Sequence, residues 1–156
     1  FTKEAIFIGL LAILAIIVII FIKYRTLKVV IPMALTIVIE VILILGIASF
    51  IARDIDLAAI AGIIIAVGTG IDHQIIIADE SLRGRTSSIY DWKTKIKRAF
   101  FIIMAAYITT VVAMLPLLFA GAGLLKGFAL TTIIGTSMGV FISRPAYAAT
   151  IEILLK

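Results

Sequence analysis

Five long apolar segments dominate this sequence, and charged residues fall mainly in the gaps between them. The segments cover about residues 5–22, 29–52, 57–78, 100–119 and 127–143. Each is close to the roughly 20 residues that an α-helix needs to cross about 30 Å of hydrocarbon. Because 63% of the 156 residues are hydrophobic, against about half in soluble domains, we predict an all-α, polytopic transmembrane helical bundle with five spans.

Lysine and arginine are distributed unevenly between the two ends of the predicted spans. If the N-terminus lies outside, then Lys3, Arg53 and Lys126 lie outside and the remaining eleven of the fourteen basic residues lie inside. Cytoplasmic segments of membrane proteins carry the excess of basic residues. We therefore predict a multi-pass protein of the cytoplasmic membrane, with the N-terminus of this chain outside and its C-terminus inside. The net charge of +5 is then explained by orientation and by anionic membrane lipids, so we predict no nucleic-acid partner.

The residue types that carry most enzyme chemistry are scarce in this chain. It contains no cysteine and one histidine, so we predict neither a disulfide nor a metal site. No nucleophile with a base beside it and no phosphate-binding loop can be assembled from the sequence. We therefore expect that the chain is not an enzyme and that it binds no cofactor.

The third apolar segment carries an ionisable residue, Asp72. A carboxylate at membrane depth costs several kcal/mol unless it is protonated, paired or reached by water, so it marks a candidate functional site. On a helix with 100° per residue, the small and polar residues on the face of Asp72 include Gly62, Gly68, Thr69 and Asp79, and the bulky residues on the opposite face include Ile63, Ile64, Val67 and Ile71. Since small and polar residues pack helix against helix and bulky aliphatic residues face lipid, we expect Asp72 to point into the bundle.

Small residues also recur at every fourth position of the same segment. They are Ala58, Gly62, Ala66 and Gly70. A ridge of this kind lets two membrane helices approach closely. We predict that it packs against another helix, and that the helix belongs to a partner protein.

Few hydrogen-bond donors are available to Asp72 at its depth. The candidates are Thr109, Thr110, Tyr107 and, near the inner end of the last span, Arg144. If no fixed cation lies beside the carboxylate, burial favours its neutral form, which suits a group that loads and releases protons. The proton-relay candidates are Asp72, Asp79 and Glu40. The alternatives are a structural role for Asp72, a solvated interfacial charge at Asp79, and a protonated Glu40 that is hydrogen-bonded across a helix interface.

The stretch Gly68-Thr69-Gly70-Ile71-Asp72-His73-Gln74-Ile75-Ile76-Ile77 is accompanied by further short motifs. They are Arg98-Ala99-Phe100, Thr109-Thr110, Lys126-Gly127-Phe128-Ala129 and Arg144-Pro145-Ala146-Tyr147. Together these residues resemble the membrane part of the SecD/SecF family of protein-export proteins, in particular its archaeal SecD members. This family is similar in fold to the resistance-nodulation-division transporters.

The resemblance implies that the five segments are the second to sixth spans of a six-span subunit. The first span and a large extracytoplasmic domain would lie outside this chain, and the start at Phe1 without a signal pattern also indicates a fragment. The implied partners are SecF, the Sec translocon channel and exported preproteins. Asp72 is the implied proton-coupling residue. Bacterial members carry an acid and an Asn where Ala105 and Tyr107 stand here, so one familiar partner of that Asp is absent.

Two other functions are compatible with the same sequence. One is a self-sufficient, proton-driven transporter of small molecules or lipids from the same superfamily. The other is a scaffold that holds SecF, with Asp72 in a structural role. The length of the complete gene would separate the first alternative from an export subunit, and a test of proton coupling would separate the second.

Overall fold

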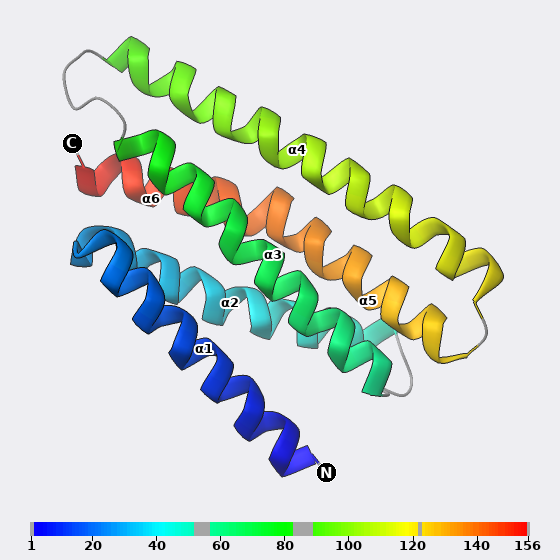
Figure 1. Cartoon of the computed structure of the whole chain (residues 1–156). Helices are drawn as coiled ribbons and strands as arrows, with labels where there is room; N and C mark the ends of the chain where they lie inside the picture. The colour runs from blue at the N-terminus through cyan, green and yellow to red at the C-terminus, as the bar shows by residue number, and fades with distance from the viewer. Residues whose placement is uncertain (1, 52–56, 83–88, 122, 156) are drawn as a thin grey trace.

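The computed structural model describes residues 2–51, 57–82, 89–121 and 123–155, and every regular element among them is a helix (Figure 1). The elements are α1 (Thr2–Tyr24), α2 (Leu27–Ile51), α3 (Leu57–Leu82), α4 (Ile89–Ala120), α5 (Leu124–Met138), the π-helical turn η1 (Gly139–Ser143) and α6 (Arg144–Leu155). The predicted all-α helical bundle is confirmed.

The helices are arranged around α3 and α5, which pack along each other at the centre (Figure 1). Helix α2 contacts both of them, and α4 also lies against both. Helix α1 packs on α2 and diverges from the other helices toward its N-terminus. Helices α5 and α6 follow each other through η1 as one rod, so that α1, α3 and α6 all end on the same side of the molecule.

Four helical segments are long and apolar enough to cross a membrane. They are Leu27–Phe50, Leu57–Leu82, Trp92–Ala120 and Leu124–Leu155. These segments contain the third to fifth predicted spans and overlap nearly all of the second, 29–52. The predicted first span, 5–22, lies within α1, of which the described apolar part is the shorter segment Leu14–Tyr24.

The last span extends well beyond its predicted end at residue 143. Pro145 has no N–H group and ordinarily disturbs the helix one turn before it. Here the turn before it widens into η1, and the N–H group of Arg144 donates to the carbonyl oxygen of Gly139, five residues earlier. This π-helical turn accommodates the proline, so the helix continues to Leu155.

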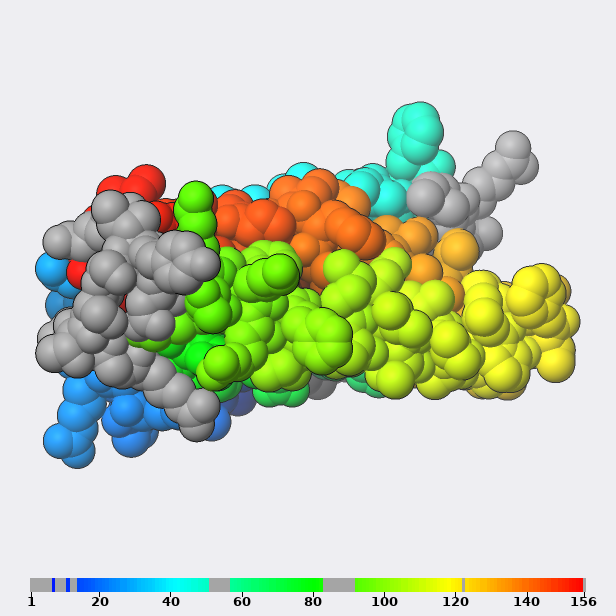
Figure 2. Space-filling view, turned by 90° about the horizontal axis from the view of Figure 1, so that it is seen from above, coloured from blue at the N-terminus to red at the C-terminus, as the bar shows by residue number. Residues whose placement is uncertain are grey.

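Helix α4 lies on the outside of the bundle. Figure 2 shows it as a green-to-yellow row along one face of the molecule. Large apolar side chains project from it, and Phe101 and Phe119 are 77% and 83% exposed. Such a surface is compatible with contact with lipid or with another transmembrane protein.

The side of α3 that faces the bundle differs from our prediction. Ile63, Val67 and Ile71 are buried, with exposed fractions of 7%, 9% and 6%, whereas Asp72 is exposed. The error has a geometric cause. A step of four residues advances a helix by about 400°, so a ridge spaced by four drifts by about 40° per step. By Gly70 the ridge lies about 160° from Asp72, and the ridge determines the inner face.

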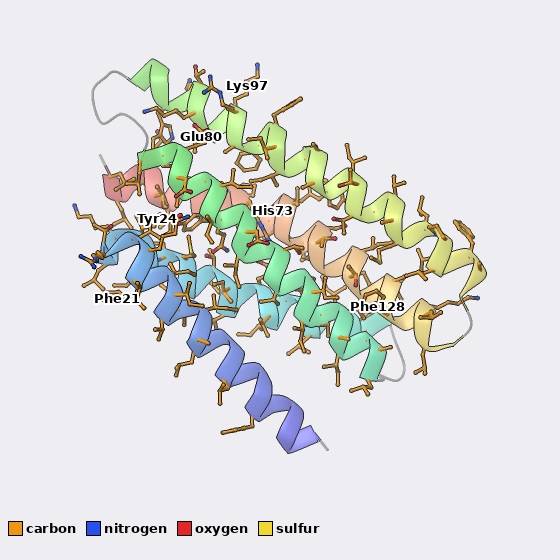
Figure 3. All side chains as sticks on the ribbon, in the orientation of Figure 1. Phe21, Tyr24, His73, Glu80, Lys97 and Phe128 are labelled. Atoms are coloured by element: carbon orange, nitrogen blue, oxygen red, sulfur yellow. The ribbon has the colours of Figure 1, made fainter. Side chains whose placement is uncertain are left out.

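The ridge itself packs closely, but its partner is α5 of the same chain. A Cβ atom at Gly62 would overlap the Oγ1 atom of Thr131 and would lie 2.6 Å from the carbonyl oxygen of Phe128, which Figure 3 shows near the start of α5. A Cβ atom at Gly135 would lie 2.5 Å from the Cβ atom of Ala66. The predicted helix packing is therefore confirmed, and its assignment to a partner protein is wrong.

Hydrogen bonds add to this contact between α3 and α5. The hydroxyl group of Thr131 lies 3.0 Å from the carbonyl oxygen of Ala59 and 2.9 Å from that of Gly127, so it can donate across the helix interface. Hydroxyl groups that bond between membrane helices commonly contribute about 0.6 kcal/mol. The contact between α3 and α5 is therefore stabilised mainly by the close approach of the two helices.

Replacing Gly62 with leucine is expected to destabilise the bundle by at least 1–3 kcal/mol, the usual cost of overpacking. The new side chain would collide with Thr131 and with the backbone at Phe128. The measurement is equilibrium unfolding of the purified full-length protein in detergent. Gly68→Leu is the matched control, because nothing lies within 4 Å of a Cβ atom at Gly68. Equal destabilisation by the two variants would contradict the close packing of α3 on α5 at Gly62.

Candidate functional site

A buried ion pair lies at the centre of the bundle. The Nη1 atom of Arg144, at the start of α6, donates to the Oε1 atom of Glu40, in the middle of α2, over 2.8 Å. The side chains of Arg144 and Glu40 are only 1% and 2% exposed. Two charges at this depth persist because each neutralises the other and is hydrogen-bonded.

Two glycines leave the space that the guanidinium group occupies. A Cβ atom at Gly139, in η1, would overlap Nη1 of Arg144. A Cβ atom at Gly70, on α3, would overlap Nη2 of Arg144 and would lie 3.0 Å from Oε1 of Glu40. Helices α2, α3 and α6 and the turn η1 therefore meet at this pair. Gly70, the second glycine of the Gly68-Thr69-Gly70 motif, therefore leaves room for the charge pair and not for Asp72.

Further polar side chains are buried around the pair. Those with a buried nitrogen or oxygen atom that has no hydrogen-bond partner among the described residues are His73, Gln74, Arg144 and Tyr147. In Arg144 the atom is Nε, and in Gln74 both amide atoms are affected. Figure 3 shows His73 near the middle of α3. Buried polar atoms are hydrogen-bonded in about nine cases of ten, so this concentration sets the centre of the bundle apart.

Asp72 does not take part in this buried centre. Each of the proposed donors is bonded to another group: Arg144 to Glu40, Tyr107 to Ser137 over 2.9 Å, and both Thr109 and Thr110 to the carbonyl oxygen of Ala106. The expectation that Asp72 points into the bundle is wrong, since Asp72 is exposed. Its carboxylate instead lies on the outer face of a helix that is long and apolar enough to span a membrane.

Gly68 and Thr69, the other two residues of the Gly68-Thr69-Gly70 motif, lie beside the outer face of α3. Gly68 has open space where a Cβ atom would stand, with nothing within 4 Å. The hydroxyl group of Thr69 lies 3.0 Å and 2.9 Å from the carbonyl oxygens of Ile65 and Ala66 in its own helix. Gly68 and Thr69 therefore leave little side-chain bulk in the turn that precedes Asp72, which allows another helix to approach closely there.

Asp79 lies near the end of α3, and its side chain bonds to two residues at the end of α1. Its Oδ2 atom lies 3.1 Å from Nζ of Lys23, and its Oδ1 atom accepts a hydrogen bond of 2.6 Å from the hydroxyl group of Tyr24. Figure 3 shows Tyr24 at the end of α1. The side chains of Lys23 and Asp79 are 45% and 49% exposed. An exposed pair of this kind contributes at most about 1 kcal/mol, so Asp79 mainly orients the end of α1.

Sequence reasoning did not anticipate the pairing of Glu40 with Arg144. The apolar pattern offers no cation at the depth of Glu40, and it predicts that Arg144 lies near the inner end of a span that stops at residue 143. The structure continues that span to Leu155, which brings Arg144 to the level of Glu40. The available signal was the presence of one acid and one arginine in two different apolar segments, since buried charges are usually paired.

Comparison with known proteins supplies independent findings. A family profile described as "Protein export membrane protein SecD/SecF, C-terminal" matches residues 1–154. The chain is 52% identical over 147 residues to the protein-export membrane protein SecD of Methanocaldococcus jannaschii, covering 94% of this chain and 36% of that protein. It is 50% identical over 159 residues to SecD of Methanothermobacter thermautotrophicus, covering 97% of this chain and 39% of that protein.

A bacterial relative is more distant. The chain is 31% identical over 144 residues to the protein translocase subunit SecDF of Brucella abortus, covering 90% of this chain and 19% of that protein. The chain therefore spans little more than a third of the length of the archaeal relatives described above.

Proposed function

Because the chain belongs to the SecD/SecF family of protein-export membrane proteins, we propose that it forms the membrane part of a subunit that assists Sec-dependent export across the cytoplasmic membrane. Its partners are then SecF, the Sec translocon channel and exported preproteins. In this proposal the first span and the large extracytoplasmic domain lie in the rest of the protein, and the N-terminus of this chain is outside and its C-terminus inside. The excess of basic residues on one side supports that orientation.

The observation that carries the mechanism is the place of Asp72 on the outer face of α3. A carboxylate that meets hydrocarbon alone is strongly disfavoured. Gly68 leaves open space beside it, and Ile65, which lies on the same face, is 43% exposed. These features suit a second transmembrane helix that covers Asp72 and supplies a hydrogen-bond donor. We assign that helix to SecF.

In this arrangement Asp72 couples export to the proton gradient by changing its protonation state. Protonation removes its charge, and with it the attraction to a donor or cation on the neighbouring helix. A change of charge at a helix interface shifts the balance between two packings of the helices, which is how a proton drives a conformational change. The names of the relatives favour export over transport of small molecules. A scaffold role predicts instead that the ability of Asp72 to titrate is irrelevant.

Photocrosslinking tests the proposed interface. A benzophenone amino acid at position 65 is expected to crosslink to co-expressed SecF, because Ile65 is exposed on the face of Asp72. The matched control is position 63, where an isoleucine of the same helix is only 7% exposed and points into the chain. Equal yields of SecF adduct from the two positions, or no adduct from position 65, would refute the assignment of this face.

A further inference from the structure

Polar side chains continue from the buried ion pair toward the end of the bundle that carries Asp79. Gly70 lies beside the pair, and Gln74 follows it by four residues on α3, about 6 Å farther along the helix. Tyr147 follows Arg144 by three residues on α6, about 4.5 Å along that helix. Helices α3 and α6 pack on each other and end on the same side of the molecule. Both steps therefore lead in the same direction.

The next polar groups in that direction are Tyr24 and Asp79. Tyr147 lies on α6, which ends on the same side of the molecule as α1 and α3, the helices that carry Tyr24 and Asp79. The hydroxyl group of Tyr24 donates to Asp79 and also lies 3.3 Å from the carbonyl oxygen of Ile75, between Gln74 and the end of α3. Asp79 is half exposed. The polar side chains in this direction thus form a route that begins at the surface with Asp79 and Tyr24 and ends in the interior with Gln74 and Tyr147.

The interior part of this route has hydrogen-bonding capacity that the protein does not use. Among the described residues, no partner reaches either amide atom of Gln74, the hydroxyl group of Tyr147 or Nε of Arg144. Gln74, Tyr147 and Arg144 are all fully buried. An unsatisfied buried polar group costs about 1–3 kcal/mol, so four such atoms would consume much of the stability of a typical domain. These four atoms therefore call for a partner that both donates and accepts hydrogen bonds.

We propose that Gln74, Tyr147 and Arg144 form a binding site for ordered water beside the Glu40–Arg144 pair. Buried water typically makes about three hydrogen bonds to polar groups that otherwise lack partners. The amide of Gln74 offers a donor and an acceptor, Nε of Arg144 donates, and the hydroxyl group of Tyr147 does both. His73, also buried and next to Gln74 in the sequence, is, with Glu40, a titratable group near the site.

The consequence is that the charge pair is solvated from the Asp79 end and is not sealed in a dry core. The site gives Nε of Arg144 a hydrogen-bond acceptor without a second carboxylate. It also brings water to a second membrane-embedded acid, Glu40, by a route that does not include Asp72. This inference does not rest on the proposed function, since it requires neither SecF nor a proton gradient.

X-ray radiolysis of the full-length protein in lipid nanodiscs tests the site directly, because hydroxyl radicals formed from bound water oxidise the side chains that touch it. Tyr107 is the matched control: it is half-buried, and its hydroxyl group is bonded to Ser137 of α5. Exposure to solvent alone would make oxidation of Tyr107 faster than oxidation of Tyr147, which is 0% exposed. The water site reverses this order, so we expect oxidation of Tyr147 to be several-fold faster. Slower or equal oxidation of Tyr147 would overturn the proposal.

The same oxidation measurement on a Gln74 variant provides a second test of the water site. Gln74→Leu keeps the approximate volume of the side chain but removes its two polar atoms, and it is expected to lower the oxidation rate of Tyr147 to that of Tyr107 or below. Ile77→Leu is the control, since Ile77 is equally buried one turn farther along α3 and offers water no partner. An unchanged rate at Tyr147 in Gln74→Leu would also overturn the proposal. Neither reading uses export, so a failure here is distinguishable from a failure of the role proposed for Asp72.

Discussion

Replacing Asp72 with asparagine is expected to abolish the stimulation of export by a proton gradient. Asparagine keeps the size and much of the hydrogen-bonding capacity of aspartate, but it cannot bind and release a proton. Export by the reconstituted full-length protein, together with SecF and the translocon, should therefore fall to the level seen without a gradient. Export without a gradient should be the same for the wild type and for Asp72→Asn.

Two comparisons make this result specific. Asp72→Glu retains a titratable group and should keep part of the gradient-dependent stimulation. Asp79→Asn changes the same residue type seven positions away on nearly the same face, where the carboxylate is already paired with Lys23 and Tyr24. It should leave most of the stimulation intact. Equal stimulation of the wild type and Asp72→Asn would support the scaffold role and remove proton coupling through Asp72.

Replacing Arg144 with methionine is expected to destabilise the bundle by about 3–5 kcal/mol, because it leaves Glu40 buried without its cation. Glu40→Met should have a comparable effect for the converse reason. The double variant Glu40→Met/Arg144→Met buries no charge, so its cost should be well below the sum of the two single costs. The measurement is equilibrium unfolding of the purified full-length protein in detergent, analysed as a double-mutant cycle.

The exposed pair at the end of α1 is a suitable control for this cycle. Lys23→Met and Asp79→Asn interrupt an ion pair of similar length, 3.1 Å, whose side chains are about half exposed. Exposed ion pairs usually contribute no more than about 1 kcal/mol, so both variants should be close to the wild type in stability. Additive losses at Glu40 and Arg144, or an equally strong coupling between Lys23 and Asp79, would contradict the central role of the buried pair.

Several features of this protein could be predicted from the sequence because they depend on neighbouring residues alone. The length and polarity of an apolar segment determine whether a helix can cross a bilayer, and the segments 29–52, 57–78 and 100–119 lie within or close to helices of the structure. Small residues at every fourth position form a ridge on any α-helix, so the close packing at Gly62 and Ala66 was predictable. The family resemblance likewise rests on short, contiguous motifs, and the comparisons confirm it.

The tertiary structure decided how those helices face one another and which charges meet. Helical periodicity gives angles between residues on one helix but not the direction of the bundle, so the ridge and Asp72 were placed on one face although they diverge. The pair of Glu40 with Arg144 joins residues 104 positions apart. It depends on the π-helical turn at Gly139–Ser143, whose i−5 hydrogen bond is set by packing and by Pro145 and has no clear local pattern. Hydrophobic length is a local property, whereas the pairing of buried charges is a property of the assembled bundle.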